Sequence, residues 1–209
     1  MAQTIDGHIA QQNGKWSTTS KEDARRMDLL RKWADCIIFS RRSLVRDNAL
    51  LYIKSNLSAK NHPRPVIIMQ KAEKLPSELH VFSAPHPAGE IWIHDAAEYG
   101  KNFSPFDENA KNNKKWTFFY FASVREIIDS LVARGFKKIL LEGGGIMNGL
   151  FFSEGLVDEV YITLIPEIIG GHADDRIVKT GEYLVKTKFY LKSMHRKKDE
   201  VFFRFIRRR

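Results

Sequence analysis

The stretch KKILLEGGGIMNGLFF, residues 137–152, decides the fold. Three consecutive glycines separate a short apolar run from a second apolar segment, which predicts a strand over Lys138–Leu141, a turn, and a helix over Gly145–Phe152. Glycine has no β-carbon, so backbone N–H groups of such a turn can approach a ligand, and a helix N-terminus favours phosphate. Glu142 ends the predicted strand, where open α/β sheets bind ligands. A plain tight turn and a structural acid remain the alternatives here.

Outward from this turn, apolar runs alternate with helical patterns. Two helices are predicted, one starting after Ser20 and one running from Ser123 to Gly135, because both begin with capping residues. Strands are predicted at Met1–Ile5, Cys36–Phe39, Val66–Met69, Leu79–Phe82, Ile91–His94, Trp116–Phe121 and Val160–Ile165. This order predicts a single α/β domain over residues 1–209. We expect a central, mostly parallel sheet with an antiparallel C-terminal edge and helices on both faces.

The composition of the 209 residues, with 43% hydrophobic and 28% charged, is that of a globular protein. No apolar run reaches the length of a membrane span, and the single cysteine, Cys36, excludes an internal disulfide. We therefore expect a cytosolic protein that does not bind membranes. The seven histidines are scattered, so no metal site is predicted.

Most of the net charge of +9 lies in the tail, where residues 186–209 hold ten Lys and Arg against two Asp and Glu. A basic tail can bind nucleic acid. Aromatic and charged residues alternate here, however, which favours two paired strands with solvated outer faces, Lys186–Ser193 and Val201–Arg207. One face of these strands must be covered, and we expect a homodimer and no nucleic-acid partner.

Two further motifs could carry chemistry. TIDGHIA (4–10) places Asp6 in a turn after the first strand, and FSRRS (39–43) places Arg41 and Arg42 at the end of another strand. Arginines at such a position can bind phosphate in a bidentate way. An ordinary turn and solvated surface charges are the alternatives for the two motifs.

Together the motifs occur in the order TIDGHIA (4–10), CIIFSRRSLVRDNALL (36–51), GFKKILLEGGGIMNGLFF (135–152) and GLVDEVYITLIPEIIGG (155–171). This order resembles the riboflavin-biosynthesis reductase domain of the dihydrofolate reductase-like superfamily. The resemblance implies an NADPH-dependent reductase that converts the ribose of a ribosylaminopyrimidine phosphate to a ribityl chain. The cofactor would carry the hydride chemistry, and the protein would place the two ligands.

Residue by residue, the resemblance implies three groups. The cofactor-binding group is Ala2, Thr4, Ser40, Arg41, Arg42, Ser43, Asp47, Gly143, Gly144, Gly145, Ile146, Met147, Asn148, Gly149 and Leu150. The substrate-binding group is Arg31, Leu51, Lys54 and Glu142, with Arg31 and Lys54 expected on the phosphate. For Arg31, which lies beside the apolar face of its helix, an internal pair with a core carboxylate is the alternative. Asp6 and Glu142 form the catalytic group. A dihydrofolate reductase-like enzyme with another substrate and a non-catalytic nucleotide-binding domain are the rival interpretations.

Overall fold

The computed structural model describes most of the chain, and its residues form two compact units. The first unit contains Met1–Ala24 and Gly144–Arg209, and the second contains Arg25–Gly143. The described residues are 1–9, 20–49, 51–53, 55, 62–83, 87–94, 103–106, 115–170, 176–182, 184 and 186–208.

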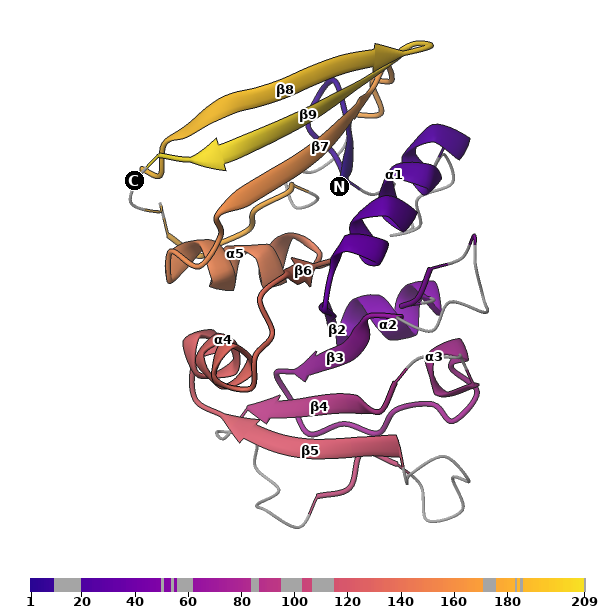
Figure 1. The fold of residues 1–209 in the computed structure, drawn as a ribbon, viewed down its shortest axis with the longest axis vertical. Helices are drawn as coiled ribbons and strands as arrows, with labels where there is room; N and C mark the ends of the chain where they lie inside the picture. Colours follow the sequence, from indigo (N-terminus) through magenta and orange to yellow (C-terminus); the bar gives the residue numbers. More distant parts are fainter. Residues whose placement is uncertain are drawn as a thin grey trace. The chain divides into compact units, whose positions relative to one another are not determined.

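The second unit contains a five-stranded sheet in which every neighbouring pair of strands is parallel (Figure 1). The strand order is β5-β4-β3-β2-β6. Short apolar runs such as that of β2 suit a strand that is covered on both faces. The bounds are Cys36–Ser40 for β2, Arg64–Met69 for β3, Gly89–His94 for β4, Trp116–Phe121 for β5 and Ile139–Leu141 for β6.

Alternate residues of these strands face opposite sides of the sheet, and residues on both sides are buried. Ile37 and Ile67 belong to a core cluster with Leu44 of α2 (Arg41–Asp47) and Val81 of α3 (His80–Ser83). Ile38, one position along from Ile37, is also fully buried and points to the opposite face. Both faces of the sheet are therefore covered, as the apolar runs predict.

Local signals predicted α4 (Val124–Ala133) well. The Ser123 hydroxyl accepts the N–H of Glu126, and Gly135 follows the helix with φ of +90°, a conformation that favours glycine. The predicted strand at Leu79–Phe82 is wrong, because these residues lead into and form the single turn of α3. Residues 79–82 hold three buried apolar side chains and the exposed His80. So short a segment suits a strand or a helix equally, and its periodicity cannot distinguish them.

The first unit contains a four-stranded sheet of order β1-β7-β9-β8 and the helix α5 (Gly145–Ser153) (Figure 1). The strand bounds are Ala2–Thr4 for β1, Glu159–Ile165 for β7, Phe189–Lys197 for β8 and Glu200–Arg207 for β9. β1 pairs with β7 in parallel, whereas β7–β9 and β9–β8 are antiparallel. The α/β class with mostly parallel strands and an antiparallel C-terminal part is confirmed. The antiparallel strands share this sheet with β1.

The helix α1 (Lys21–Trp33) begins as its sequence predicts. The Ser20 hydroxyl accepts the N–H of Asp23. The Asp23 carboxylate in turn accepts the hydroxyl of Thr163 on β7 at 2.7 Å, and both side chains are buried. This bond joins the start of α1 to the sheet of the first unit.

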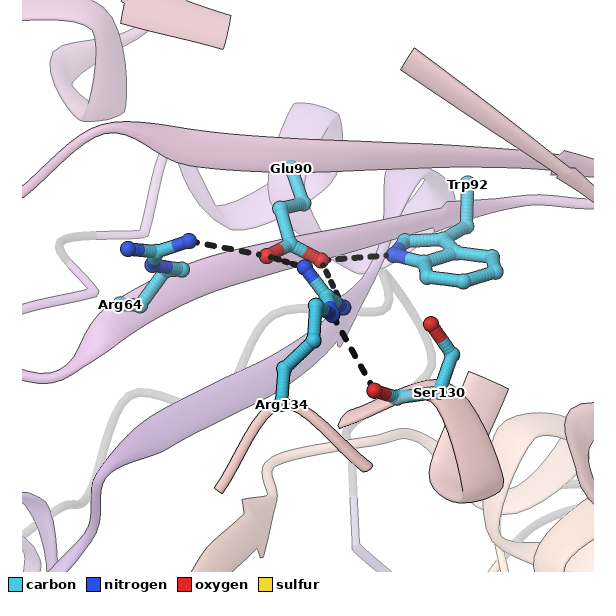
Figure 2. A network of polar contacts seen from close by, with 5 residues as sticks. All are labelled: Arg64, Glu90, Trp92, Ser130 and Arg134. Atoms are coloured by element: carbon cyan, nitrogen blue, oxygen red, sulfur yellow. Dashed lines mark hydrogen bonds and ion pairs between the residues drawn. The ribbon is translucent and has the colours of Figure 1, made fainter. Parts of the chain in front are cut away.

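A buried carboxylate links the strands of the second unit to the end of α4. Glu90 on β4 is 1% exposed and accepts hydrogen bonds from Arg64, from Trp92 and from both Nη atoms of Arg134 (Figure 2). These donors hold the pKa of Glu90 below its ordinary value even though burial acts to raise it. All of the partners come from within the unit, so Glu90 is a structural residue.

Candidate functional site

The triple-glycine turn connects β6 to α5, as predicted. The Glu142 N–H donates to the carbonyl of Ile38 at 2.9 Å, which extends the ladder between β6 and β2 by one bond. Gly144 occupies the position before α5 in an extended conformation, and no described side chain caps the first turn of the helix. The N–H groups of that turn are therefore suited to an anionic ligand.

Two of the glycines assigned to the cofactor have a second reason for lacking a side chain. A β-carbon at Gly145 would overlap the carbonyl oxygen of Arg176, and one at Gly149 would overlap that of Lys179. The Lys179 N–H donates to the Gly145 carbonyl at 2.9 Å, and the side-chain amide of Asn148 donates to the carbonyl of Ile177 at 2.7 Å. These contacts hold the segment 176–180 against α5.

The remaining residues of this helix divide by exposure. Met147 is 4% exposed, whereas Ile146 is 47% exposed in the first turn. Gly143 is buried, and Leu150 is half-buried. Of the predicted run from Gly143 to Leu150, the first turn of α5 is the part best placed to meet a cofactor. The segment 176–180, which no local sequence pattern connects with this helix, covers the other part.

Arg31 and Glu142, both predicted to bind substrate, bind each other. The Arg31 Nε donates to Oε1 of Glu142 at 2.8 Å, and Nη2 donates to Oε2 at 2.7 Å. Nη1 donates to the carbonyl of Tyr52 at 3.3 Å. The side chains are 9% and 8% exposed. Burial acts to lower the pKa of Arg31, but the bonds to Glu142 outweigh it and raise that pKa.

The bonds to Glu142 occupy the edge of the Arg31 guanidinium that carries Nε and Nη2. A bidentate pair is the strongest arrangement that an arginine makes with an acid, and it uses the edge that would otherwise hold a phosphate. Each carboxylate oxygen accepts at about two lone-pair positions, so Glu142 keeps acceptor capacity beside its bonds to Arg31. What the pair offers a ligand is therefore the firmly oriented carboxylate of Glu142, and not a free Arg31 guanidinium.

The serines of the FSRRS motif begin α2. The Ser40 hydroxyl accepts the N–H of Ser43 at 3.1 Å and donates to the Ser43 hydroxyl at 3.0 Å. Asp47, at the other end of the helix, accepts both Nε and Nη2 of Arg46. Capping and a local ion pair thus account for the contacts that these residues make.

The two arginines of the motif have different surroundings. Arg41 forms an ion pair with Glu73 and donates to the carbonyl of Lys74 at 2.7 Å, so it binds the segment after β3. Arg42 is exposed. Of the two, Arg42 is the better candidate for an incoming phosphate. The sequence offered no signal for the partners of Arg41, which lie more than thirty residues away.

Asp6 connects the turn after β1 to the segment after β7. Its carboxylate accepts the Thr4 hydroxyl and the N–H groups of Ile169 and Gly170. The bond from Thr4 is the largest cause that lowers the pKa of Asp6. Asp6 is therefore charged at neutral pH, and a role for it as a proton donor is disfavoured.

Of the remaining predicted contacts, Leu51 and Ala2 belong to the described residues and Lys54 does not. Leu51 is fully buried in the core of the second unit, so a substrate could meet its backbone but not its side chain. Ala2 lies on β1, one of the two edge strands of its sheet. Lys54 lies outside the described residues.

Within the described ranges, His, Cys, Asp and Glu form no group of three or more that could hold a metal ion. No described helix is long and apolar enough to cross a membrane.

The fold defines the class of protein as an α/β domain that shares its fold with solved RibD structures. RibD from Acinetobacter baumannii superimposes with a TM-score of 0.78 at 16% identity, over 100% of this chain and 56% of that one. The chain thus spans about half of that protein. A pyrimidine reductase-like protein from Corynebacterium diphtheriae superimposes with a TM-score of 0.75 at 17% identity, over 100% of this chain and 90% of the other.

The family follows from the sequence comparison. The model of the RibD C-terminal domain matches residues 1–203, and this chain belongs to that family. Two relatives are each named 2,5-diamino-6-ribosylamino-4(3H)-pyrimidinone 5′-phosphate reductase and are each 27% identical. The relative from Methanothermobacter thermautotrophicus aligns over 87% of this chain and 82% of its own length. The relative from Archaeoglobus fulgidus aligns over 89% of this chain and 86% of its own length.

Proposed function

We propose that this chain is an NADPH-dependent reductase of riboflavin biosynthesis, acting on a ribosylaminopyrimidine 5′-phosphate. The family match over residues 1–203 carries the proposal, and the names of the two archaeal relatives support the substrate. The cofactor would supply a hydride to C1′ of the ring-opened ribosylamine while a proton from water reaches the nitrogen, which leaves a ribityl chain and NADP⁺. The rest of the work is binding and orientation by the protein.

Each unit, taken by itself, contains a group suited to a phosphate of the proposed cofactor. In the first unit, the uncapped first turn of α5 supplies N–H groups for a pyrophosphate. In the second unit, exposed Arg42 supplies a positive charge for the 2′-phosphate that distinguishes NADPH from NADH. We assign Glu142 to substrate hydroxyl or ring N–H groups, with Arg31 as the residue that positions it.

The test is a turnover assay that follows NADPH oxidation. The diamino pyrimidine substrate, its deaminated uracil counterpart and dihydrofolate are each offered, and mass spectrometry checks the product for two added hydrogens. We expect turnover with one of the two pyrimidines. Glu142→Gln should reduce kcat/KM by about tenfold or more, because a lost hydrogen bond to a charged group costs about 1.5–3 kcal/mol. Asp199→Ala, at an exposed turn, is the control that keeps full activity.

Three outcomes contradict the proposal. Turnover of dihydrofolate alone would support the rival reductase, and NADPH binding without turnover of either pyrimidine would support a non-catalytic domain. Equal kcat/KM with NADPH and NADH would show that Arg42 does not select NADPH through its 2′-phosphate. If that role holds, Arg42→Ala should narrow the preference for NADPH more than Arg41→Ala, since Arg41 is engaged by Glu73.

We also propose that the protein is a homodimer. The edge strand β8 exposes Tyr190, Leu191 and Met194, by 39%, 49% and 60%. Apolar side chains on an unpaired edge favour association, and a twofold dimer is the commonest form. Light scattering at micromolar concentration should give twice the chain mass. A monomeric mass would reject the dimer without affecting the proposed activity.

A further inference from the structure

A cavity of approximately 490 Å³ lies in the first unit, where the C-terminal end of α5 meets the segment before β8 and the end of β9. Figure 1 shows the start of β8 and the end of β9 side by side, near the mark for the C-terminus. Pockets that hold small molecules have about this volume. None of the residues that line the cavity belongs to the groups assigned above to cofactor or substrate.

Four of the lining residues are cations, namely Lys186, Lys188, Arg207 and Arg208, and no described lining residue is an acid. The strand register places two of the cations together. Arg207 pairs with Phe189, and the Arg208 N–H donates to the Lys188 carbonyl at 2.8 Å, so Lys188 and Arg208 lie opposite each other. Like charges at opposite positions of an antiparallel pair destabilise it. An anion in the cavity would relieve that repulsion.

One of the four cations already has a structural partner. Arg207 donates from Nη1 to the carbonyl of Gly155, just beyond α5, where the helix dipole favours a positive charge. Its backbone N–H donates to the backbone carbonyl of Asp158 at 2.8 Å. Capping of the helix thus explains Arg207 and fixes its position. It does not explain Lys186, Lys188 and Arg208, all of which are exposed.

The cavity also has an apolar side. Phe152 and Leu184 contribute to its wall, and the Phe152 ring stands edge-on to Phe189 with 6.1 Å between ring centroids. That contact fixes the ring as part of the wall. A ligand with an apolar or flat part would bury it against these side chains, and its charged part would meet the cations.

We propose that this cavity binds a small polyanion with a flat part, of the chemical class of the nucleoside polyphosphates. The site goes beyond the proposed reductase activity and does not depend on it. Phosphate groups match the four cations, and a base matches the wall at Phe152. ATP, without metal, is the probe.

The experiment is calorimetric titration of ATP into the full chain at physiological ionic strength, alone and with NADPH in excess. We expect ATP to bind in both cases, adenosine not to bind, and tripolyphosphate to bind more weakly than ATP. The double variant Lys188→Gln with Arg208→Gln should weaken ATP binding by about tenfold or more, because charge-assisted bonds are lost. The control is Lys21→Gln with Lys192→Gln, which removes two exposed charges elsewhere in the same unit and should change the affinity by less than about twofold.

Four outcomes would overturn the proposal. The first is no binding of ATP up to millimolar concentration. The second is equal weakening by the two double variants, which would mean general attraction to a basic surface. The third is tripolyphosphate binding as tightly as ATP, which would exclude a role for the wall. The fourth is complete displacement of ATP by NADPH together with an unchanged ATP affinity of the double variant Lys188→Gln with Arg208→Gln. ATP would then bind at the cofactor site.

Discussion

Two arginine–glutamate pairs of the same geometry lie in different surroundings, one in each unit. Arg31 binds Glu142 through Nε and Nη2 at 2.8 and 2.7 Å, and Arg204 binds Glu159 through the same atoms at 2.9 and 2.8 Å. The first pair is 9% and 8% exposed, and the second is 38% and 29% exposed. Geometry alone therefore does not fix the contribution of an ion pair. The cost of leaving one partner without the other rises with burial.

The same contrast separates the two sheets. The parallel sheet of the second unit is covered on both faces, and its ion pairs centre on the carboxylates of Glu90 and Glu142, which are buried. The strand β8 of the first unit is exposed along nearly its whole length and carries charge at its surface. We expect mutations of charged residues to lower the free energy of unfolding strongly in the parallel sheet of the second unit and only mildly in the sheet of the first unit.

The largest effect is expected for Arg31→Ala, which leaves the Glu142 carboxylate buried without its main partner. The free energy of unfolding should fall by about 3–5 kcal/mol. Urea denaturation monitored by tryptophan fluorescence measures it. The double variant Arg31→Leu with Glu142→Leu is the matched control. It should lose less stability than Arg31→Ala, since no uncompensated charge stays buried, and an equal or larger loss in the double variant would contradict the argument.

A smaller effect is expected for Glu90→Gln, which keeps an acceptor for Trp92 but removes the negative charge beside Arg64 and Arg134. We expect a loss of about 1–3 kcal/mol at neutral pH. The pKa of Glu90 is lowered in the folded state, so its contribution is present above the unfolded pKa of about 4.3 and is lost as the pH falls through the folded value. Unfolding measured from pH 7 downwards should thus show a shallower loss in the variant. Parallel curves for the two proteins would argue against this role.

A change of similar size is expected where α5 meets the segment 176–180. Gly149→Ala would push against the Lys179 carbonyl and should cost about 1–3 kcal/mol, with faster amide exchange across that segment. Gly181→Ala is the control, because a β-carbon there meets nothing within 4 Å. It should be neutral or stabilise by at most about 1 kcal/mol. If the two variants have the same thermal stability, the close approach is not a constraint.

The smallest effect is expected for Arg204→Ala, the counterpart of Arg31→Ala in the first unit. Water screens the Arg204–Glu159 pair, so the loss should be about 1 kcal/mol or less. The pKa of Glu159 is lowered mainly by the bond from Arg204, so it should rise in the variant. Titration by NMR checks that rise. A fall in the free energy of unfolding as large as that of Arg31→Ala would contradict the conclusion that burial sets the cost of breaking such a pair.

The sequence by itself determined the elements whose signals are local. Ser123, Glu126 and Gly135 bracket α4, the triple glycine joins β6 to α5, and the alternating tail forms β8 and β9. Capping and periodicity act over a few residues, so they can be read directly from the chain. The ordered motifs also pointed to the family that the comparison confirmed.

Only the tertiary structure decided which side chains meet. The sequence assigned Arg31 and Glu142 to a substrate, with an unnamed core carboxylate as the alternative partner of Arg31. The fold identifies that carboxylate as Glu142, 111 residues away. It likewise gives Gly145 and Gly149 a packing role against a segment that local patterns left unassigned, and it gathers Arg64 and Arg134 around Glu90. Such pairings depend on how strands are ordered and which faces they bury. Hydrophobic patterning along the chain specifies that a residue is buried, whereas its partner is chosen by the packing of distant elements.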